Sequence, residues 1–143
     1  MILDSEQATA ELGRAIARKV RAGDVIALSG PLGVGKTALA RSILEALGHE
    51  GEVPSPTFAI VQPYELLDPP VWHVDLYRIE DAGEIEELGL DAAEEGLLLL
   101  EWPERAGKRA FGETLRLNLE FDGSGARRLT ADVPPSWEGR WPT

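Results

Sequence analysis

The segment GPLGVGKT, at residues Gly30 to Thr37, limits the possible folds of this chain more than any other part of its sequence. It matches the phosphate-binding loop pattern GxxxxGK(S/T), in which N–H groups of a glycine-rich turn and the positive end of a helix converge on one anion. Lys36 can reach the outer phosphates as a point charge, and the Thr37 hydroxyl can join the coordination of magnesium. The segment therefore predicts a nucleotide site.

The residues around this loop predict the strand and the helix that it requires. Residues 25–29 are a short apolar run, as expected of a buried parallel strand. Residues 36–47 place leucine and isoleucine at helical spacing, and Gly48 ends the helix. The predicted nucleotide-binding residues of this region are Gly30, Pro31, Leu32, Gly33, Val34, Gly35, Lys36, Thr37 and Ala38.

Apolar patterns predict the other elements of the chain. Asp4 with Gln7 resembles a capping box at the start of an amphipathic helix that Gly23 ends. The predicted strands cover residues 58–62, 71–75, 97–100, 115–121 and 127–133, the last two forming a hairpin. These elements predict an α/β fold of the three-layer P-loop class, with a mainly parallel central sheet and a C-terminal antiparallel hairpin.

The length of 143 residues suits one domain with a single core. We expect this domain over residues 1–133, followed by a tail over residues 134–143. The tail contains prolines and tryptophans without periodicity, so we expect it either to be disordered or to dock its tryptophans on the domain or on a partner.

The composition excludes several classes of protein. The chain has no cysteine, which excludes a disulfide framework, a thiolate metal site and a cysteine nucleophile. Its formal charge of -11 repels nucleic-acid phosphates, so a partner is expected to hold any nucleic acid involved. The sequence shows neither an apolar run of about 18 residues nor a secretory signal, so we expect a cytoplasmic protein without a membrane segment.

Asp75 and Glu101 each end a predicted buried strand. If these strands run parallel to the strand before the loop, both carboxylates lie at the edge of the sheet that carries the phosphate site. One would bind magnesium directly or through water while the other polarises the attacking water, and the sequence leaves open which does which. The catalytic candidates are therefore Asp75, Glu101 and Lys36, and the metal candidates are Thr37, Asp75 and Glu101. The alternative is that each acid is solvated or paired with a nearby arginine.

Three further residues lie near these candidates in the sequence. Thr57 is a candidate nucleotide-binding residue that could sense the terminal phosphate, although it could also be an ordinary loop threonine. Trp102 could border the nucleotide or a partner, or could pack under the turn at Pro103. His73 lies in an alternating strand and is interpreted as a packed or exposed histidine rather than a base.

With these residues in place, the chain resembles the TsaE family, also called YjeE, the bacterial P-loop ATPases of the tRNA threonylcarbamoyladenosine pathway. The resemblance implies that Thr57 belongs to a switch-like loop, that Asp75 and Glu101 are the magnesium and catalytic acids, and that Trp102 borders the nucleotide or a partner. It covers most of the domain and rests on GPLGVGKT at residues 30–37, SPTF at 55–58, Tyr64, HVDLYR at 73–78 and LEWPER at 100–105.

The resemblance also implies an activity and partners. It implies a Mg²⁺-dependent ATPase that acts with the TsaB and TsaD proteins, where the transferase puts the threonylcarbamoyl group on tRNA. This chain would meet tRNA only through that assembly, and its ATP hydrolysis would reset or drive the assembly. It would hydrolyse ATP slowly by itself, because a site completed by a partner lacks part of its electrostatic stabilisation.

Three other interpretations of the phosphate-binding loop stay open. A small-molecule kinase would share the loop and the magnesium site, but the sequence shows no convincing arginine-bearing lid. A GTP-dependent switch would need to read guanine, and the chain lacks an NKxD motif. A scaffold that binds nucleotide without turnover would keep the loop and have no use for the two acids.

Overall fold

The computed structural model describes residues 1–53, 61–80, 83–84, 89–106 and 113–142. Among these residues, no helix is both long and apolar enough to cross a membrane. The helices and strands are β1 Ile2–Leu3, α1 Glu6–Ala17, β2 Val25–Ser29, α2 Lys36–Ala46, β3 Val61–Tyr64, β4 Val71–Asp75, η2 Leu90–Glu95, β5 Leu97–Glu101, η3 Pro103–Ala106, β6 Leu115–Phe121, β7 Arg127–Asp132 and η4 Pro135–Trp137.

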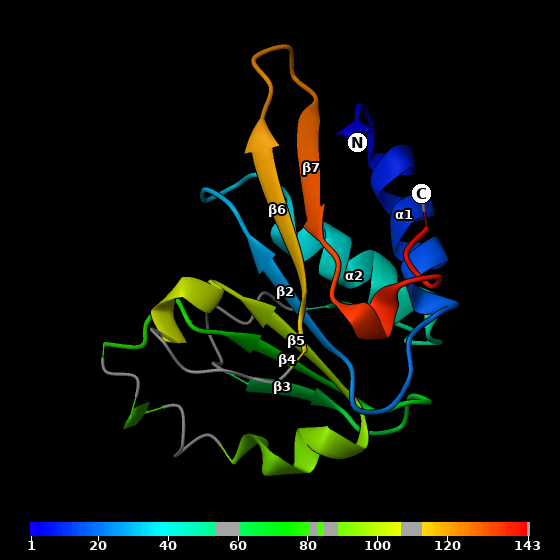
Figure 1. The fold of residues 1–143 in the computed structure, drawn as a ribbon, viewed down its shortest axis with the longest axis vertical. Helices are drawn as coiled ribbons and strands as arrows, with labels where there is room; N and C mark the ends of the chain where they lie inside the picture. The colour runs from blue at the N-terminus through cyan, green and yellow to red at the C-terminus, as the bar shows by residue number, and fades with distance from the viewer. Residues whose placement is uncertain (54–60, 81–82, 85–88, 107–112, 143) are drawn as a thin grey trace.

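The strands form one seven-stranded sheet in the order β1-β7-β6-β2-β5-β4-β3 (Figure 1). The four central strands β6, β2, β5 and β4 are parallel, whereas β3 at one edge and the β7 and β1 strands at the other pair antiparallel. Continuous apolar runs such as the four leucines of β5 suit parallel strands that are buried on both faces. The predicted fold class, with its parallel centre and antiparallel hairpin, is confirmed.

The two faces of the sheet are covered by different elements. Ile26 and Leu28 of β2 belong to a core cluster with residues of α1 and α2. The alternate residues Val25 and Ala27 belong to a second cluster on the other face, which η2 and the segment after β4 cover. Gly13 lets α1 approach α2 closely, because a Cβ there would lie 2.3 Å from the Cβ of Ser42. The sheet is therefore the middle of three layers.

Several predicted boundaries differ from the structure, most of them by one residue. The N-cap of α1 is Ser5 rather than Asp4, because the Ser5 hydroxyl accepts a hydrogen bond of 3.1 Å from the N–H of Ala8. The helix ends at Ala17, well before Gly23, and the N–H groups of Lys19 and Val20 bond three residues back in a tightened last turn. Of the predicted strand at 58–62, residues 58–60 lie outside the described residues, and β3 continues to Tyr64.

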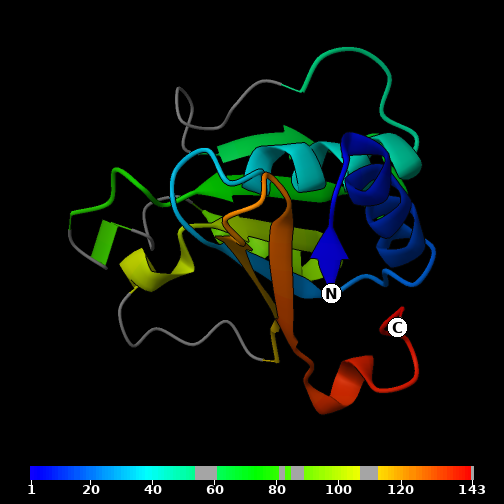
Figure 2. The ribbon, with the colours of Figure 1, turned by 90° about the horizontal axis from the view of Figure 1, so that it is seen from above.

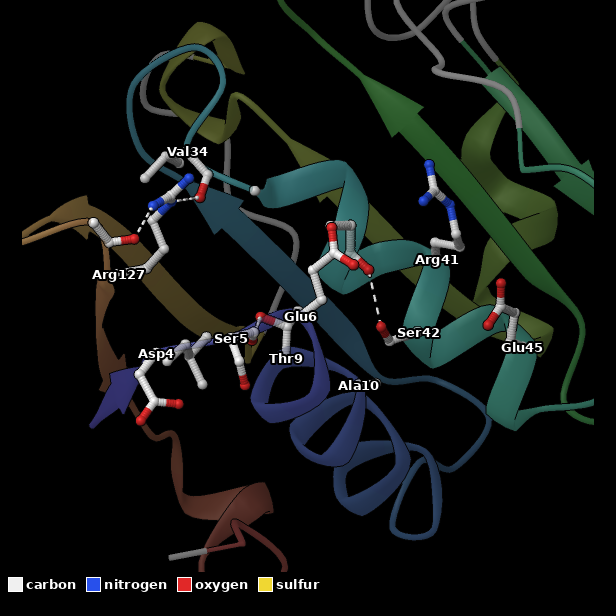
Figure 3. A pocket seen from close by; sticks show the side chains of 14 residues that line it. Asp4, Ser5, Glu6, Thr9, Ala10, Val34, Arg41, Ser42, Glu45 and Arg127 are labelled. Carbon is white, nitrogen blue, oxygen red and sulfur yellow. Dashed lines mark hydrogen bonds between the residues drawn. The ribbon is translucent and has the colours of Figure 1, made fainter.

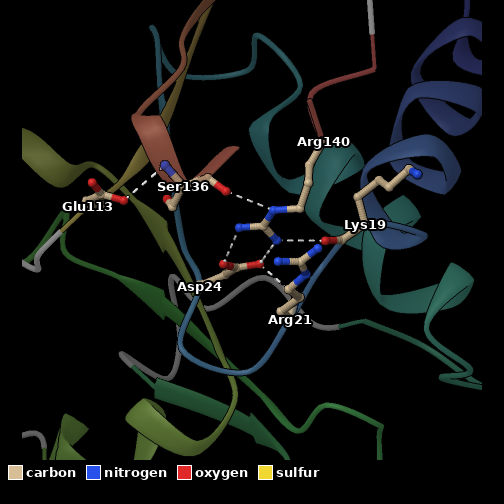
Figure 4. Close-up of polar contacts among 6 residues, drawn as sticks. All are labelled: Lys19, Arg21, Asp24, Glu113, Ser136 and Arg140. Atoms are coloured by element: carbon tan, nitrogen blue, oxygen red, sulfur yellow. Dashed lines mark hydrogen bonds and ion pairs between the residues drawn. The ribbon is translucent and has the colours of Figure 1, made fainter. Parts of the chain in front are cut away.

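The end of the chain packs on the domain instead of extending away from it. Trp137 has 1% of its surface exposed and belongs to the core cluster on the α1 and α2 face. Arg140 forms an ion pair with Asp24, the residue before β2 (Figure 4). Both views of the ribbon place the two ends of the chain near each other (Figures 1 and 2). Of the two behaviours expected for the tail, docking on this domain is the one observed.

Candidate functional site

The loop between β2 and α2 has the backbone that its glycines allow. Gly30, Gly33 and Gly35 have φ angles of 140°, 78° and 114°, values that side chains rarely adopt. A Cβ at Gly30 would lie 2.3 Å from the carbonyl oxygen of Leu119 in β6, so this position accepts only glycine. Gly35 is the N-cap of α2 and provides no side-chain cap. The first turn of α2 therefore begins at the loop with no cap of its own on its N–H groups, as an anion site requires.

Lys36, the first residue of α2, folds back over the loop. Its ammonium donates to the carbonyl oxygen of Gly30 and, at 3.5 Å, to that of Pro31. The same nitrogen lies 3.6 Å from the centroid of the Trp102 ring. The ammonium is thus held over the loop by two carbonyl oxygens and an aromatic ring, none of which is charged. A charged phosphate oxygen would bind it more strongly, so the ammonium can move from these partners to a phosphate.

The charges around Lys36 are mostly negative. Burial lowers the pKa of Lys36 from its usual value of 10.5, and the carboxylates of Glu101, Glu104 and Asp75 oppose this shift. Lys36, Asp75 and Glu101 are all at least 95% buried. Two buried carboxylates beside one buried ammonium leave a negative excess that suits a bound cation.

The two acids lie side by side at the carboxyl edge of the sheet. Asp75 of β4 pairs with Glu101 of β5, and Glu101 pairs with Leu28 of β2. The Thr37 hydroxyl lies 3.1 Å and 3.3 Å from the two carboxylate oxygens of Glu101. Asp75 accepts a hydrogen bond of 2.8 Å from the N–H of Tyr77. The structure thus brings Lys36, Thr37 and both acids to one place.

His73 also belongs to this group, which the sequence interpretation missed. Its Nε2 lies 2.6 Å from Oε2 of Glu101, and the residue is fully buried. The available signal was the spacing of two residues between His73 and Asp75, because alternate residues of a strand share one face. The sequence interpretation left a packed or an exposed position open for His73; the structure shows the packed one, and the contact with Glu101 was not foreseen.

Trp102 follows Glu101 at the same edge. It is the one residue other than glycine with a positive φ, 60°, in the described part of the chain. A left-handed backbone is strained for a bulky side chain and often marks a functional site. The ring faces Lys36, and its centroid lies 4.9 Å from that of the Tyr77 ring. The ring therefore lies beside the phosphate-binding loop while packing against the second core cluster, and its role at a nucleotide stays a prediction.

Two neighbouring pockets open around the loop. The first, of about 220 Å³, is lined by residues of the phosphate-binding loop and the start of α2, together with Asp75, Glu101 and Trp102. The second, of about 570 Å³, lies between the start of α1, the outer side of α2 and β7 (Figure 3). Gly35 and Ala38 line both pockets, so the two pockets adjoin at the start of α2. The predicted catalytic residues line the smaller pocket, and the larger one was not foreseen from the sequence.

The remaining predicted residues differ in their positions. Leu32 is 75% exposed at the tip of the loop, whereas Val34 is buried. The carbonyl oxygen of Val34 accepts a hydrogen bond of 2.9 Å from Nε of Arg127, which ties β7 to the loop (Figure 3). Pro31 is exposed and contributes its carbonyl oxygen to Lys36. Thr57 lies outside the described residues.

The side chains at this edge fit magnesium bound together with a nucleotide. The described residues include no group of three or more His, Cys, Asp or Glu side chains that could hold a metal by themselves. Magnesium does not need such a group, because it keeps several waters and takes one or two carboxylates plus phosphate oxygens. The adjoining oxygens of Thr37 and Glu101 match that requirement.

Known proteins with related sequences or folds support one assignment. A family model described as "Threonylcarbamoyl adenosine biosynthesis protein TsaE" matches residues 3–129. A protein named tRNA threonylcarbamoyladenosine biosynthesis protein TsaE from Streptomyces coelicolor is 39% identical over 141 residues, covering 86% of this chain and 95% of that protein. A protein of the same name from Rickettsia felis is 35% identical over 122 residues, covering 84% and 71%. The crystal structure of Bacillus subtilis YdiB has a TM-score of 0.83 and 27% identity, covering 98% of this chain and 88% of that one.

Proposed function

Because this chain belongs to the TsaE family, we propose that it is the ATP-binding and ATP-hydrolysing subunit required for the threonylcarbamoyladenosine modification of tRNA. The observation that carries the proposal is the convergence of the glycine loop, Lys36 and the Thr37–Glu101 pair on one small pocket. The names of the related proteins supply the pathway. Binding and hydrolysis are supported by the chemistry of the pocket.

The loop residues are assigned to the phosphates. The N–H groups of Gly33, Gly35 and the first turn of α2 would bind the phosphate oxygens. Lys36 would leave the carbonyl oxygens of the loop and meet the outer phosphates. In this assignment, the exposed Leu32 contributes its backbone and leaves its side chain at the rim of the pocket.

Thr37 and Glu101 are assigned to Mg²⁺, because their oxygens already lie within hydrogen-bond distance of each other. When bound, Mg²⁺ would neutralise charge on the phosphates. Asp75, which neighbours Glu101 in the sheet, is assigned to the waters of the site, including the attacking one. If this division holds, Glu101→Gln raises the Mg²⁺ concentration that nucleotide binding requires, whereas Asp75→Asn leaves that concentration unchanged and lowers hydrolysis. The reverse pattern would exchange the two roles.

The larger pocket is assigned to the sugar and the base of the nucleotide. It adjoins the phosphate pocket at Gly35 and Ala38, and Ser5, Thr9 and Arg127 offer polar atoms along it (Figure 3). Its volume of about 570 Å³ lies within the usual range for small-molecule sites. Trp102 lies in the other pocket, so its ring would border the phosphates rather than the base.

The partners are assigned by the family and by charge. The chain would act on the TsaB–TsaD assembly and would not carry the threonylcarbamoyl group. A net charge of -11 opposes direct tRNA binding, so tRNA would be met through the assembly, in the cytoplasm. Activity by itself would be low, because partner docking would complete the electrostatics of the site.

The test is ATP hydrolysis by the purified protein with and without TsaB and TsaD, together with tRNA modification. We expect the partners to raise the release of free phosphate, and modification to require this chain with Lys36 intact. No effect of the partners would remove the pathway assignment. Transfer of the γ-phosphate to a metabolite would identify a kinase instead, and a clear preference for GTP in competition binding would overturn the assignment of ATP.

A further inference from the structure

We propose that His73 is a positioning residue that fixes the Glu101 carboxylate for cation binding, an inference that rests on the metal role proposed above for Glu101. The contact is short, with 2.6 Å between Nε2 of His73 and Oε2 of Glu101. The side chain of His73 is fully buried and that of Glu101 is 4% exposed. A hydrogen bond in such surroundings is strong, and replacing it with water would be difficult.

The strand register explains how this contact forms. His73 pairs with Leu99 and Asp75 pairs with Glu101, so Glu101 lies two residues further along β5 than the residue opposite His73. Alternate residues of a strand share one face, which places His73, Asp75 and Glu101 on the same side of the sheet. A long side chain can reach a diagonal neighbour on the adjacent strand. His73 therefore contacts Glu101 diagonally across the two strands. It lies two residues before Asp75 in β4, further from the carboxyl edge of the sheet.

The other ring nitrogen of His73 defines the direction of the hydrogen bond. Nδ1 is buried and has no hydrogen-bond partner in the described part of the chain. A proton on Nδ1 would be a buried donor without an acceptor, which is costlier than an unused acceptor. The neutral ring with its proton on Nε2 avoids this cost and donates to Glu101.

Glu101 is thus held from two sides. The Thr37 hydroxyl contacts it from α2, and His73 contacts it from β4. If the Thr37 hydroxyl turns to Mg²⁺, the imidazole is left to fix the rotation of the carboxylate. Partners of this kind orient metal ligands in many proteins, and their loss typically weakens metal binding about 10- to 100-fold.

Two replacements of similar length separate the hydrogen bond from packing. His73→Gln keeps an N–H donor at about the distance of Nε2, and His73→Met fills similar space without a donor. The readout is the Mg²⁺ concentration at which binding of a fluorescent ATP analogue is half-maximal. We expect His73→Met to raise this concentration about 10- to 100-fold and His73→Gln to raise it less than about threefold. Equal shifts in both variants would overturn the inference.

Glu101→Gln, measured beside these variants, distinguishes failure of the inference from failure of the proposed function. If Glu101→Gln raises the Mg²⁺ requirement and His73→Met does not, only the positioning role of His73 is wrong. If Glu101→Gln leaves the requirement unchanged, the metal role of Glu101 is wrong as well. We expect His73→Met combined with Glu101→Gln to be no worse than Glu101→Gln by itself, because His73 acts through Glu101. A further additive loss would contradict this dependence.

The unmodified protein provides a second measurement that does not depend on how the His73 variants fold. The chain has two histidines, so the ring nitrogen resonances of His73 can be assigned against a His49→Gln variant. We expect the neutral ring with its proton on Nε2, and slow exchange of that proton with water. Glu101→Gln should weaken the hydrogen bond and speed the exchange. A proton on Nδ1 in the unmodified protein, or exchange that Glu101→Gln does not change, would contradict the inference.

Discussion

Strand β2 has a buried group of charges at each end, and the two groups differ in how well their charges are matched. At the amino end, Asp24 receives two hydrogen bonds from the guanidinium of Arg140, at 2.9 Å and 3.0 Å (Figure 4). The remaining donors of Arg140 reach the carbonyl oxygens of Lys19 and Ser136, and the guanidinium lies over the Trp137 ring. This group thus pairs one cation, Arg140, with one anion, Asp24, and each nitrogen of the guanidinium donates a hydrogen bond.

At the carboxyl end, the ammonium of Lys36 faces two buried carboxylates and a nearby third, Glu104. Its own partners are two carbonyl oxygens and the ring of Trp102. The negative charge is in excess at the carboxyl end of β2, whereas the charges at the amino end are matched. This difference indicates that the two groups have different roles. The amino end is expected to stabilise the fold, whereas the carboxyl end suits the nucleotide and cation of the proposed function.

The largest expected effect is on stability, at the amino end. Arg140→Met should lower the free energy of unfolding by about 3 kcal/mol, because it leaves the Asp24 carboxylate, whose side chain is 9% exposed, without its cation. The affinity for ATP should change less than about twofold. Urea unfolding and nucleotide binding measure the two quantities. Adding Asp24→Asn should recover part of the loss, since no buried charge then remains unpaired. A loss of nucleotide affinity equal to the loss of stability would remove the distinction between the two ends.

The next effect is on binding, at the carboxyl end. Lys36→Ala should weaken the affinity for ATP about 100-fold, because charge-assisted hydrogen bonds to phosphate are lost. Urea unfolding without nucleotide is measured beside it to separate this loss of affinity from a change in stability, because the variant also removes the cation that lies beside two buried carboxylates. Lys19→Ala is the matched control, because it removes the same charge from an exposed position. Equal losses of affinity in the two variants would indicate an effect of net charge alone.

A smaller effect separates the tryptophans of the two ends. Binding of ATP should change the intrinsic fluorescence, because Lys36 would move away from the Trp102 ring when it meets the phosphates. Trp102→Phe should remove most of this change while altering the affinity less than about threefold. The contact of an ammonium with an aromatic ring contributes about 0.5–1 kcal/mol, and the phenylalanine ring keeps part of it. Trp137→Phe should keep the fluorescence change and lower the melting temperature instead. A fluorescence change lost only with Trp137 would contradict this division.

The smallest effect is the dependence of stability on pH. The pKa of Lys36 is lowered in the folded protein, so between that pKa and 10.5 the unfolded chain binds more protons. The free energy of unfolding contributed by Lys36 should therefore rise as the pH rises through this window. The difference in stability between the unmodified protein and Lys36→Met, measured by urea unfolding from pH 8 upward, isolates this contribution. A difference that falls with pH would contradict the lowered pKa.

Much of the fold was predictable because it depends on local patterns. Residues 25–29, 71–75 and 115–121 were predicted as strands and form β2, β4 and β6 with the same bounds. The start of α1 was placed one residue early, since Asp4 and Ser5 are both good N-cap residues and their sequence does not rank them. Helix ends depend on caps and packing, which explains why the end at Ala17 was missed.

The sequence by itself determined the phosphate-binding loop. Its glycines, Lys36 and Thr37 are adjacent in the chain, so one short segment specifies both the backbone and the side chains of the cradle. The tertiary structure alone decided which distant residues join it. The contact of His73 with Glu101 spans 28 residues and that of Asp24 with Arg140 spans 116. Such contacts depend on the order and register of strands, which arise from packing of the whole core and leave no mark on local periodicity.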